Sequence, residues 1–389
     1  MGEIGRTPTG QRPVDECQET EKDMNAKIEA TPDNIGIAKI KVVGVGGGGS
    51  NAVSRMYRDR LPEVEYITVN TDAQALVRSD VPIRLRIGDE TARGLGVGGD
   101  PEKGQACAEE SRDEVREVLE GADMVFIAAG MGGGTGTGAA PIVAEIAREM
   151  GALTVGVVTQ PFAFEGRRRM KHAEEGIARL KDKVDTLITI PNDRLLIICD
   201  EEVTMESGFR MADNILRQGV QSIAELVTVA GEINLDFADI KAVMSNAGPA
   251  WMAIGSGSGD KRAIDAAEEA IQSPLLDVSL EGARGVIFNI TGPSDLTITE
   301  VHQASEVISQ VVDPEANIMF GMVTDMKMEN EVKLTIIATG FPVMDGAINM
   351  MDAEHVAPDP SLIDIPPFLL RNPAALRRAR NNVAATSMD

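Results

Sequence analysis

A glycine-rich stretch between a predicted strand and a predicted helix constrains this chain more than any other feature. It reads Gly130-Met131-Gly132-Gly133-Gly134-Thr135-Gly136-Thr137-Gly138-Ala139-Ala140. The apolar run before it, Met124 to Ala129, is typical of a strand buried on both faces of a parallel sheet. After it, Pro141 fits a first helical turn, and apolar residues recur at helical spacing from Ile142 to Ala147. A flexible linker seldom occupies such a position, so the stretch predicts a structured turn that binds a ligand.

The chemistry of this turn favours a phosphate ligand. Glycines leave the backbone N–H groups uncovered, so these groups and the N-terminus of the helix can converge on anionic oxygens. Thr135 and Thr137 add hydroxyl donors. The candidate contacts are Gly133, Gly134, Thr135, Gly136 and Thr137.

A second glycine cluster follows another predicted strand, Ile40 to Val45. Two such turns indicate one polyphosphate, and no Gly-Lys-Ser/Thr sequence occurs, so a triphosphate would be held without a P-loop lysine. Gly44-x-Gly46-x-x-Gly49 also fits the dinucleotide fingerprint, with Glu63 or Glu65 near the place of a ribose-binding acid, which keeps a nicotinamide oxidoreductase as an alternative. The candidate contacts are Gly47, Gly48, Gly49, Ser50 and Asn51.

The pattern of apolar runs predicts an α/β fold. From Lys39 to about Val203, strand-like runs alternate with helical patterns, which indicates a Rossmann-like parallel sheet with ligands at the carboxyl ends of its strands. A wide apolar face predicts a long helix from about Ser207 to Val229. The other predicted strands are Tyr66 to Asn70, Leu153 to Thr159, Thr186 to Pro191, Gly285 to Ile290 and Val332 to Ala338, with a helix at about Thr299 to Val311.

We expect five segments. They are a disordered arm (1–38), a nucleotide-binding domain (39–206), a central helix (207–229), a smaller C-terminal α/β domain (230–341), and a linker with a tail (342–389). The net charge of −24 argues against nucleic-acid binding by the main body.

The remaining composition points to a cytoplasmic protein. Cys17, Cys107 and Cys199 lie far apart, which argues against a disulfide framework or a zinc site, and the three histidines are scattered. No apolar run reaches the length of a membrane span, and the N-terminus lacks a secretory apolar region.

At this point the motifs carry a resemblance. Gly132 to Gly138 resembles the signature of the tubulin/FtsZ family, and the similarity extends from Ile40 to about Gly340. The resemblance implies a GTPase that binds GTP or GDP with Mg²⁺ and assembles into filaments for cell division. The supporting segments are Asn70 to Leu76, Gly94 to Gly98, Pro161 to Gly166, Ile190 to Asp193 and Asn234 to Asp239.

Phe209 and Asp213 are candidates for recognition of the base. They stand four residues apart at the start of the long predicted helix, so they share one face. One carboxylate accepts both the N1–H and the exocyclic amine of guanine, whereas adenine offers no such pair of donors, so Asp213 would select GTP. The resemblance puts the ring of Phe209 against the base. The alternative is a core aromatic residue beside an acid near a helix N-terminus.

Four further positions carry roles that the resemblance implies. Glu165 and Arg169 would contact the ribose and the guanine or phosphate side of the nucleotide, with Asn192 nearby. The alternative for Glu165 and Arg169 is a surface ion pair. Asp72 would help to hold a water bound to Mg²⁺, and its alternative is a solvated loop acid.

Asp236 and Asp239 are the candidate catalytic carboxylates, with Asn234 orienting the loop or the water. The phosphate-binding turns contain no general base, and phosphoryl transfer needs a positioned water. The resemblance implies that this loop reaches the γ-phosphate of the neighbouring subunit in a head-to-tail filament. The alternative is a helix N-cap before the helical stretch Ile240 to Met244. A nonhydrolysing protein of the same fold would have lost the acidic pair, and both aspartates are present.

The tail interrupts its polar linker with an apolar cluster between Ile363 and Arg371. It resembles the C-terminal peptide with which this family docks on membrane-tethering division adaptors, which predicts localisation at the mid-cell division site. The alternative is a segment that packs back on its own domain.

Overall fold

The computed structural model describes residue 2 and residues 38–61, 63–198, 204–228, 235–273, 280, 282–326 and 328–341. Several sequence predictions lie outside these ranges, among them residues 1 and 3–37 of the arm, with Cys17, and also Cys199, Asn234 and the segment Ile363 to Arg371. All described residues up to Phe341 belong to one compact unit.

Parallel strands form the first half of the sheet, as the apolar runs predict. The strand order is β3-β2-β1-β4-β5-β6, and every neighbouring pair is parallel. Of these strands, only β3 lacks a counterpart among the sequence predictions. The strands are β1 (Ile40–Val45), β2 (Val64–Asn70), β3 (Ile83–Arg86), β4 (Met124–Gly130), β5 (Leu153–Gln160) and β6 (Thr186–Pro191).

Helices cover both faces of this parallel region, because successive residues of a strand point to opposite faces and both sets are apolar. Val43 and Ile127 pack in a core with α5 and α6, whereas Val42 and Phe126 pack in a second core with α2 and α9. The helices are α2 (Gly46–Arg58), α3 (Ala73–Val77), α4 (Pro101–Glu110), α5 (Arg112–Leu119), α6 (Thr135–Glu149), η2 (Ala163–Glu165), α7 (Arg167–Lys181), α8 (Asn192–Ile198) and α9 (Met205–Thr228).

One local prediction is wrong. Pro141 lies in the interior of α6 and not in its first turn, because the helix begins six residues earlier, at Thr135. The residues from Thr135 to Gly138 are themselves helical, so the amides at the start of this stretch belong to the first turn of α6.

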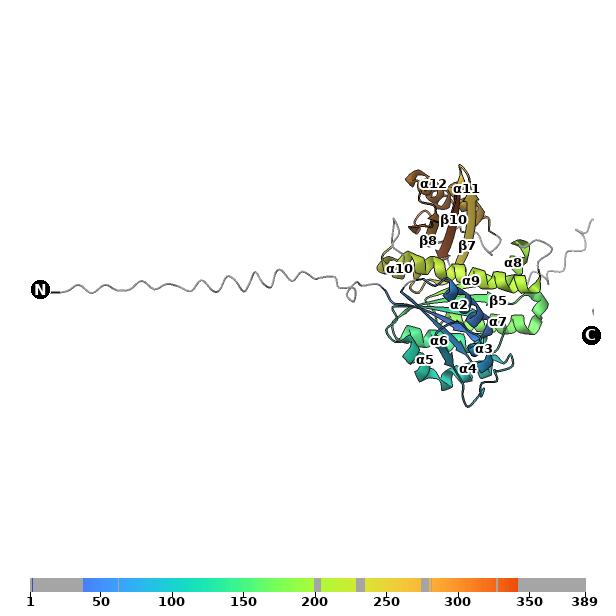
Figure 1. Ribbon diagram of the computed structural model, residues 1–389. Coiled ribbons are helices and arrows are strands. Elements are labelled where there is room, and N and C mark those ends of the chain that lie inside the picture. Colours follow the sequence, from blue (N-terminus) through green and yellow to red (C-terminus); the bar gives the residue numbers. More distant parts are fainter. Residues whose placement is uncertain are drawn as a thin grey trace, which may run out of the picture. The chain divides into compact units, whose positions relative to one another are not determined.

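The long helix α9 runs between the parallel strands and the strands of the second half (Figure 1). Its apolar face, with Leu216, Val220 and Ile223, is buried in the core it shares with β1 and β4. The bounds agree closely with the predicted helix from Ser207 to Val229.

The second half continues the sheet with mixed pairing. β7 is parallel to β6 at Gly248 to Ala250, then antiparallel to β10, which pairs antiparallel with β8, and β8 is parallel to β9. A separate core lies under α11 and α12. The predicted smaller α/β domain is therefore present, with two strands, β7 and β9, that were not predicted. Its elements are α10 (Phe237–Met244), β7 (Gly248–Ser258), α11 (Arg262–Ile271), β8 (Gly285–Gly292), α12 (Ile298–Ser309), β9 (Asn317–Thr324) and β10 (Glu331–Thr339).

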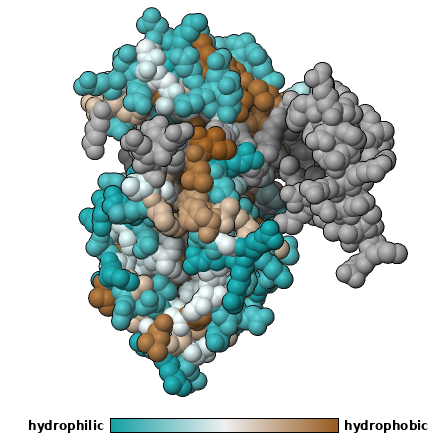
Figure 2. Space-filling model, turned by 90° about the vertical axis from the view of Figure 1, so that its right-hand side faces the viewer, coloured by the Kyte–Doolittle hydropathy of each residue, from teal (hydrophilic) through white to brown (hydrophobic). Residues whose placement is uncertain are grey.

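The side of the molecule that carries α8 faces the viewer in Figure 2, where hydrophobic surface lies between two mostly hydrophilic ends. Large apolar side chains on α8, at the start of α9 and in η2 are exposed. They are Phe164, Leu196, Ile197, Met205 and Phe209.

Candidate functional site

A cavity of about 330 Å³ opens where the two glycine-rich turns meet at the carboxyl ends of β1 and β4. This is the edge at which open α/β sheets bind ligands. The cavity brings together most of the predicted nucleotide contacts. Its lining residues are Gly47, Gly48, Gly130, Met131, Gly133, Gly134, Thr135, Gly136, Thr159, Pro161, Glu165, Arg169, Asn192, Phe209, Ala212 and Asp213.

The glycines of the two turns serve two different structural roles. A Cβ on Gly47 or Gly133 would meet no atom within 4 Å, so at these positions the bare backbone adjoins open space in the cavity. A Cβ on Gly49 would lie 2.1 Å from the carbonyl oxygen of Ala128, and one on Gly44 would lie 2.5 Å from that of Gly49. Gly44 and Gly49 therefore let α2 pack closely on β1 and β4. This packing explains why glycines occur at these positions of the dinucleotide fingerprint without a bound dinucleotide.

The two threonines of the turn are partly engaged within the protein. The hydroxyl of Thr137 accepts a hydrogen bond of 2.9 Å from the N–H of Gly132, and this side chain is fully buried outside the cavity lining. Thr135 lines the cavity, and its hydroxyl is 2.7 Å from that of Thr71. Thr137 thus fixes the shape of the turn, while Thr135 stands at the cavity wall.

One side of the cavity is formed by the first turns of α9. Phe209 and Asp213 both line it, and the ring of Phe209 contacts that of Phe162 edge-on at 5.5 Å between centroids. Burial raises the pKa of Asp213 to about 6, although the nearby cation of Arg55 acts in the opposite direction. An ionised carboxylate with few partners is costly in such a place unless a ligand donates to it.

Asn192 supplies an unsatisfied polar group to the same cavity. It is 5% exposed at the start of α8, and its Oδ1 is buried without a hydrogen-bond partner in the described structure. A buried acceptor without a partner costs free energy, so this oxygen fits a ligand that donates hydrogen bonds.

Glu165 and Arg169 form the ion pair that the sequence allows, and both also line the cavity. Oε1 of Glu165 accepts from the N–H of Phe162 at 2.9 Å, so the carboxylate is fixed in place. The side chain of Arg169 remains 56% exposed, which leaves it free to turn toward a ligand.

The other predicted contacts lie elsewhere. Ser50 and Asn51 line a separate cavity, beside α2, and Gly49 is a packing residue. Asp72 caps α3, because its Oδ1 accepts from the N–H groups of Gln74 and Ala75 at 2.8 and 3.3 Å. No group of three or more potential metal ligands occurs among the residues that the structure describes.

The carboxylates of Asp236 and Asp239 are exposed at the start of α10. Asp236 stands at the N-cap position, but its side chain accepts no capping hydrogen bond. The alternative role of this carboxylate as a helix cap is therefore not observed. Within the described ranges, neither carboxylate has a hydrogen bond or ion pair to a side chain or backbone group.

These two aspartates lie far from the cavity of their own chain. The carbonyl of Met244, at the end of α10, accepts from the hydroxyl of Thr186 at the amino end of β6, whereas Asn192 follows the carboxyl end of that strand. Along α9, Asp213 and Thr228 are separated by about 22 Å at 1.5 Å per residue. Figure 1 shows α10 and α8 near opposite ends of α9.

Sequence reasoning missed some cavity residues. Gly130, Thr159 and Pro161 line it at or just after the ends of β4 and β5, and Ala212 lines it from α9. The strand predictions contained the signal for the first group, because strand ends at the carboxyl edge face the ligand.

Among the described helices, none is long and apolar enough to cross a membrane.

Comparison with known families and structures gives consistent results. Residues 39–200 match the description "Tubulin/FtsZ family, GTPase domain", and residues 248–342 match "FtsZ family, C-terminal domain". A mutant form of FtsZ from M. jannaschii is 44% identical, with 78% of this chain and 92% of that chain covered and a TM-score of 0.76.

Two further solved structures are similar. An empty FtsZ dimer from M. jannaschii is 43% identical, with 82% of this chain and 92% of that chain covered and a TM-score of 0.76. GDP-bound CetZ1 from Haloferax volcanii is 22% identical, with coverages of 79% and 96% and a TM-score of 0.68, which shows the shared fold.

Proposed function

This chain belongs to the tubulin/FtsZ family and is a GTPase that forms filaments, and we propose that a second subunit completes its hydrolytic site. The observation that carries the proposal is the separation of the cavity from Asp236 and Asp239. Their carboxylates have no partner within the described chain, and they lie at the opposite edge of the sheet.

The cavity suits a guanine nucleotide. Gly47, Gly133 and the first turn of α6 present uncovered amides for the phosphates, and Thr135 adds a hydroxyl. Asp213 accepts the two donors of guanine, Asn192 offers its unpaired oxygen to a polar group of the nucleotide, and Phe209 packs against the ring. Glu165 and Arg169 bind the ribose and the adjacent side of the nucleotide.

Mg²⁺ fits this arrangement only with the nucleotide bound. Asp72 uses Oδ1 as a helix cap, so it is suited to hold a water of the ion rather than the ion itself. The phosphates and waters would supply the remaining oxygen ligands, as is usual for Mg²⁺. The ion would neutralise charge on the transferred phosphoryl group.

Head-to-tail assembly brings Asp236 and Asp239 of one subunit to the cavity of the next. Such heterologous contacts propagate instead of closing, which gives a filament. The exposed apolar side chains on α8 and at the start of α9 would be covered in that contact. There the two carboxylates, with Asn234, would position the attacking water.

Mixing two inactive variants tests the shared site. Asp239→Ala keeps the cavity but removes a carboxylate, whereas Asp213→Ala keeps the acidic loop, the segment that carries Asp236 and Asp239, but damages base binding. Each alone should have little GTPase activity, and the mixture should recover part of it. Asp265→Ala, which removes an exposed aspartate from the first turn of α11, is the matched control with full activity. A mixture no more active than its parts would contradict the proposal.

We place the protein in the cytoplasm at the mid-cell division site, tethered through the segment Ile363 to Arg371 to a membrane-bound adaptor. The apolar cluster in that segment supports the assignment. Truncation after Pro360 should leave GTP-dependent sedimentation intact but abolish recruitment to vesicles that carry the adaptor. Loss of assembly on truncation would make this segment part of the folded body.

A further inference from the structure

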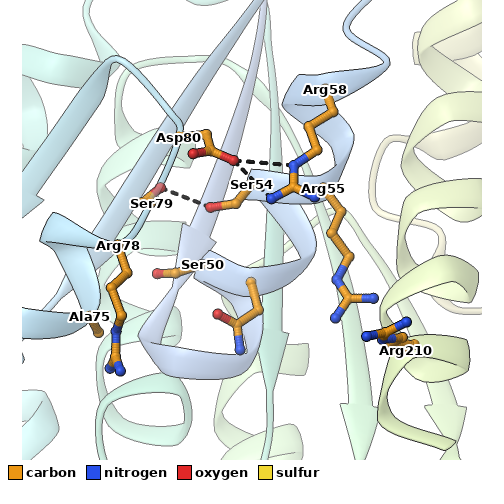
Figure 3. A pocket seen from close by; sticks show the side chains of 10 residues that line it. Ser50, Ser54, Arg55, Arg58, Ala75, Arg78, Ser79, Asp80 and Arg210 are labelled. Carbon is orange, nitrogen blue, oxygen red and sulfur yellow. Dashed lines mark hydrogen bonds and ion pairs between the residues drawn. The ribbon is translucent and has the colours of Figure 1, made fainter. Parts of the chain in front are cut away.

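A second cavity, of about 670 Å³, lies beside α2 and shares no lining residue with the nucleotide cavity. Side chains from α2, α3, the segment after α3 and α9 surround it (Figure 3). Its lining residues are Ser50, Asn51, Ser54, Arg55, Arg58, Ala75, Arg78, Ser79, Asp80 and Arg210.

The lining is strongly basic in a chain whose net charge is −24. Four arginines face one carboxylate, Asp80, which is already bound by Nε and Nη2 of Arg58 at 3.1 and 3.0 Å. Arg55 pairs with Asp213, and Arg210 pairs with Glu206 on its own helix. The guanidinium of Arg78 has no hydrogen-bond or ion-pair partner within the described residues. The cavity therefore holds one guanidinium, that of Arg78, that the described residues leave without a partner.

Ser50 gives an independent indication of a ligand. Its residue is 3% exposed, it lines the cavity, and its Oγ has no hydrogen-bond partner in the described structure. A buried hydroxyl without a partner is destabilising, since it has lost its hydrogen bonds to water. In Figure 3 the Ser50 side chain lies between α2 and Arg78, on the side of the cavity where the unpaired guanidinium stands. A bound oxygen there would satisfy both groups.

We propose that this cavity binds a small oligophosphate, held by Arg78, Arg55 and Arg210 and by the hydroxyl of Ser50. Guanidinium groups match phosphate oxygens in geometry and charge, and here they come from three separate elements, so they suit several phosphate groups better than one. The volume falls in the range of small-molecule sites. The inference does not depend on the proposed catalytic arrangement, because the cavity is separate and the acidic loop takes no part in it.

Two sources carry this chemistry: a free inorganic oligophosphate and the triphosphate group of a second nucleotide. Tripolyphosphate is the probe for the first source. ATP is the probe for the second, because adenine lacks the pair of donors that Asp213 accepts in the nucleotide cavity.

The test is calorimetric titration of tripolyphosphate into the full-length protein at low ionic strength, with GDP at saturation so that the nucleotide cavity is filled. We expect saturable binding at one site per chain. Arg78→Ala and Ser50→Ala should each weaken that binding by about tenfold or more, since each loses a direct hydrogen bond to a charged group. Arg116→Ala removes an arginine from α5, outside both cavities, and should leave the affinity unchanged.

Further measurements separate a ligand site from a structural role. Ser50→Ala should not lower the unfolding temperature, because the hydroxyl lost has no partner in the protein. Competition of ATP with bound tripolyphosphate would identify the nucleotide-borne source, and absence of competition the inorganic one. The proposal fails if no saturable binding occurs with GDP present, or if Arg78→Ala binds tripolyphosphate as tightly as the unmodified protein.

Discussion

Nε of Arg55 on α2 lies 3.3 Å from Oδ2 of Asp213 on α9, and this ion pair forms the boundary between the two cavities. The carboxylate lines the nucleotide cavity and the guanidinium lines the basic one. The side chain of Asp213 is 14% exposed, so the pair is only partly screened by water. Arg55 lowers the pKa of Asp213 and thereby keeps the carboxylate nearer to its ionised form, which is the form that would accept both guanine donors in the proposed site.

The raised pKa of Asp213 predicts a pH dependence of stability in the nucleotide-free protein. Its pKa rises from 3.8 to about 6 on folding, so the folded state holds the proton more tightly. The resulting stabilisation is complete below the unfolded pKa and is lost as the pH rises through about 6. Asp213→Asn should remove this dependence, and above that pH it should be more stable, by on the order of 2–3 kcal/mol.

Urea unfolding at a series of pH values measures this effect as the difference between the two proteins. GTP affinity should show the opposite trend, rising with pH through about 6 in the unmodified protein and staying low in Asp213→Asn. Asp265→Asn, at an exposed position, is the control. Unfolding free energies that differ by a constant amount at every pH would contradict the assigned environment of Asp213.

Removal of the Arg55 guanidinium should raise the pKa of Asp213 further. Arg55→Ala eliminates the charge that lowers the pKa of Asp213, so a larger fraction of the carboxyl is protonated at neutral pH. GTP should bind more weakly to Arg55→Ala at neutral pH, and raising the pH should restore part of the affinity. Fluorescence titration with a labelled GTP analogue measures both. A loss of affinity that does not depend on pH would show that Arg55 acts by another route.

The sequence predicted the parallel sheet well because its strands are continuous apolar runs. β3 was not predicted because it has only four residues, and Arg84 and Arg86 alternate with its two apolar residues. β7 contains Gly255 and Gly257, which usually weaken a strand. The structure explains both glycines: a Cβ at either position would lie within 2.1 Å of a carbonyl oxygen of α11, so only glycine lets this helix pack on the strand.

One helical turn separates Phe209 from Asp213, and the structure places both at one cavity; their roles toward a nucleotide stay predictions. The sequence prediction treated Gly47 to Asn51 as one set of contacts, whereas the cavity formed by the two glycine-rich turns lies at the N-terminal end of α2. Only the first residues of the helix reach it, and Ser50 and Asn51 lie farther along, beside the basic cavity. The ion pair between Arg55 and Asp213 could not be predicted, since no sequence pattern indicates that these residues of α2 and α9 lie close together.

Two glycines of α2 should respond to alanine in opposite ways. Gly49→Ala places a Cβ 2.1 Å from the carbonyl oxygen of Ala128, so α2 must move off the sheet, and we expect a loss of about 3 kcal/mol or more in unfolding free energy. Gly47→Ala meets no atom within 4 Å and should be neutral or stabilising, by up to about 1 kcal/mol. It should nevertheless weaken GTP binding, because its methyl group enters the cavity at the proposed phosphate end. Chemical denaturation and nucleotide titration of both variants separate these effects, and equal stability of the two would refute the packing role of Gly49.

The distance between Asp213 and the acidic loop leads to a kinetic prediction. A site that needs two subunits is empty of catalytic groups in the monomer, so GTP turnover per molecule should rise steeply with protein concentration above a threshold. Asp236→Asn and Asp239→Asn keep the size of each side chain, so they should bind GTP normally and still sediment with it, while turnover falls by roughly two orders of magnitude or more. Asp265→Asn provides the matched control, with unchanged turnover and the same threshold. Phosphate release and sedimentation measured over one dilution series test the arrangement directly. Turnover per molecule that stays constant from dilute monomer to filament would place the whole hydrolytic site within one chain, and the separation of Asp236 and Asp239 from the cavity would then have no catalytic meaning.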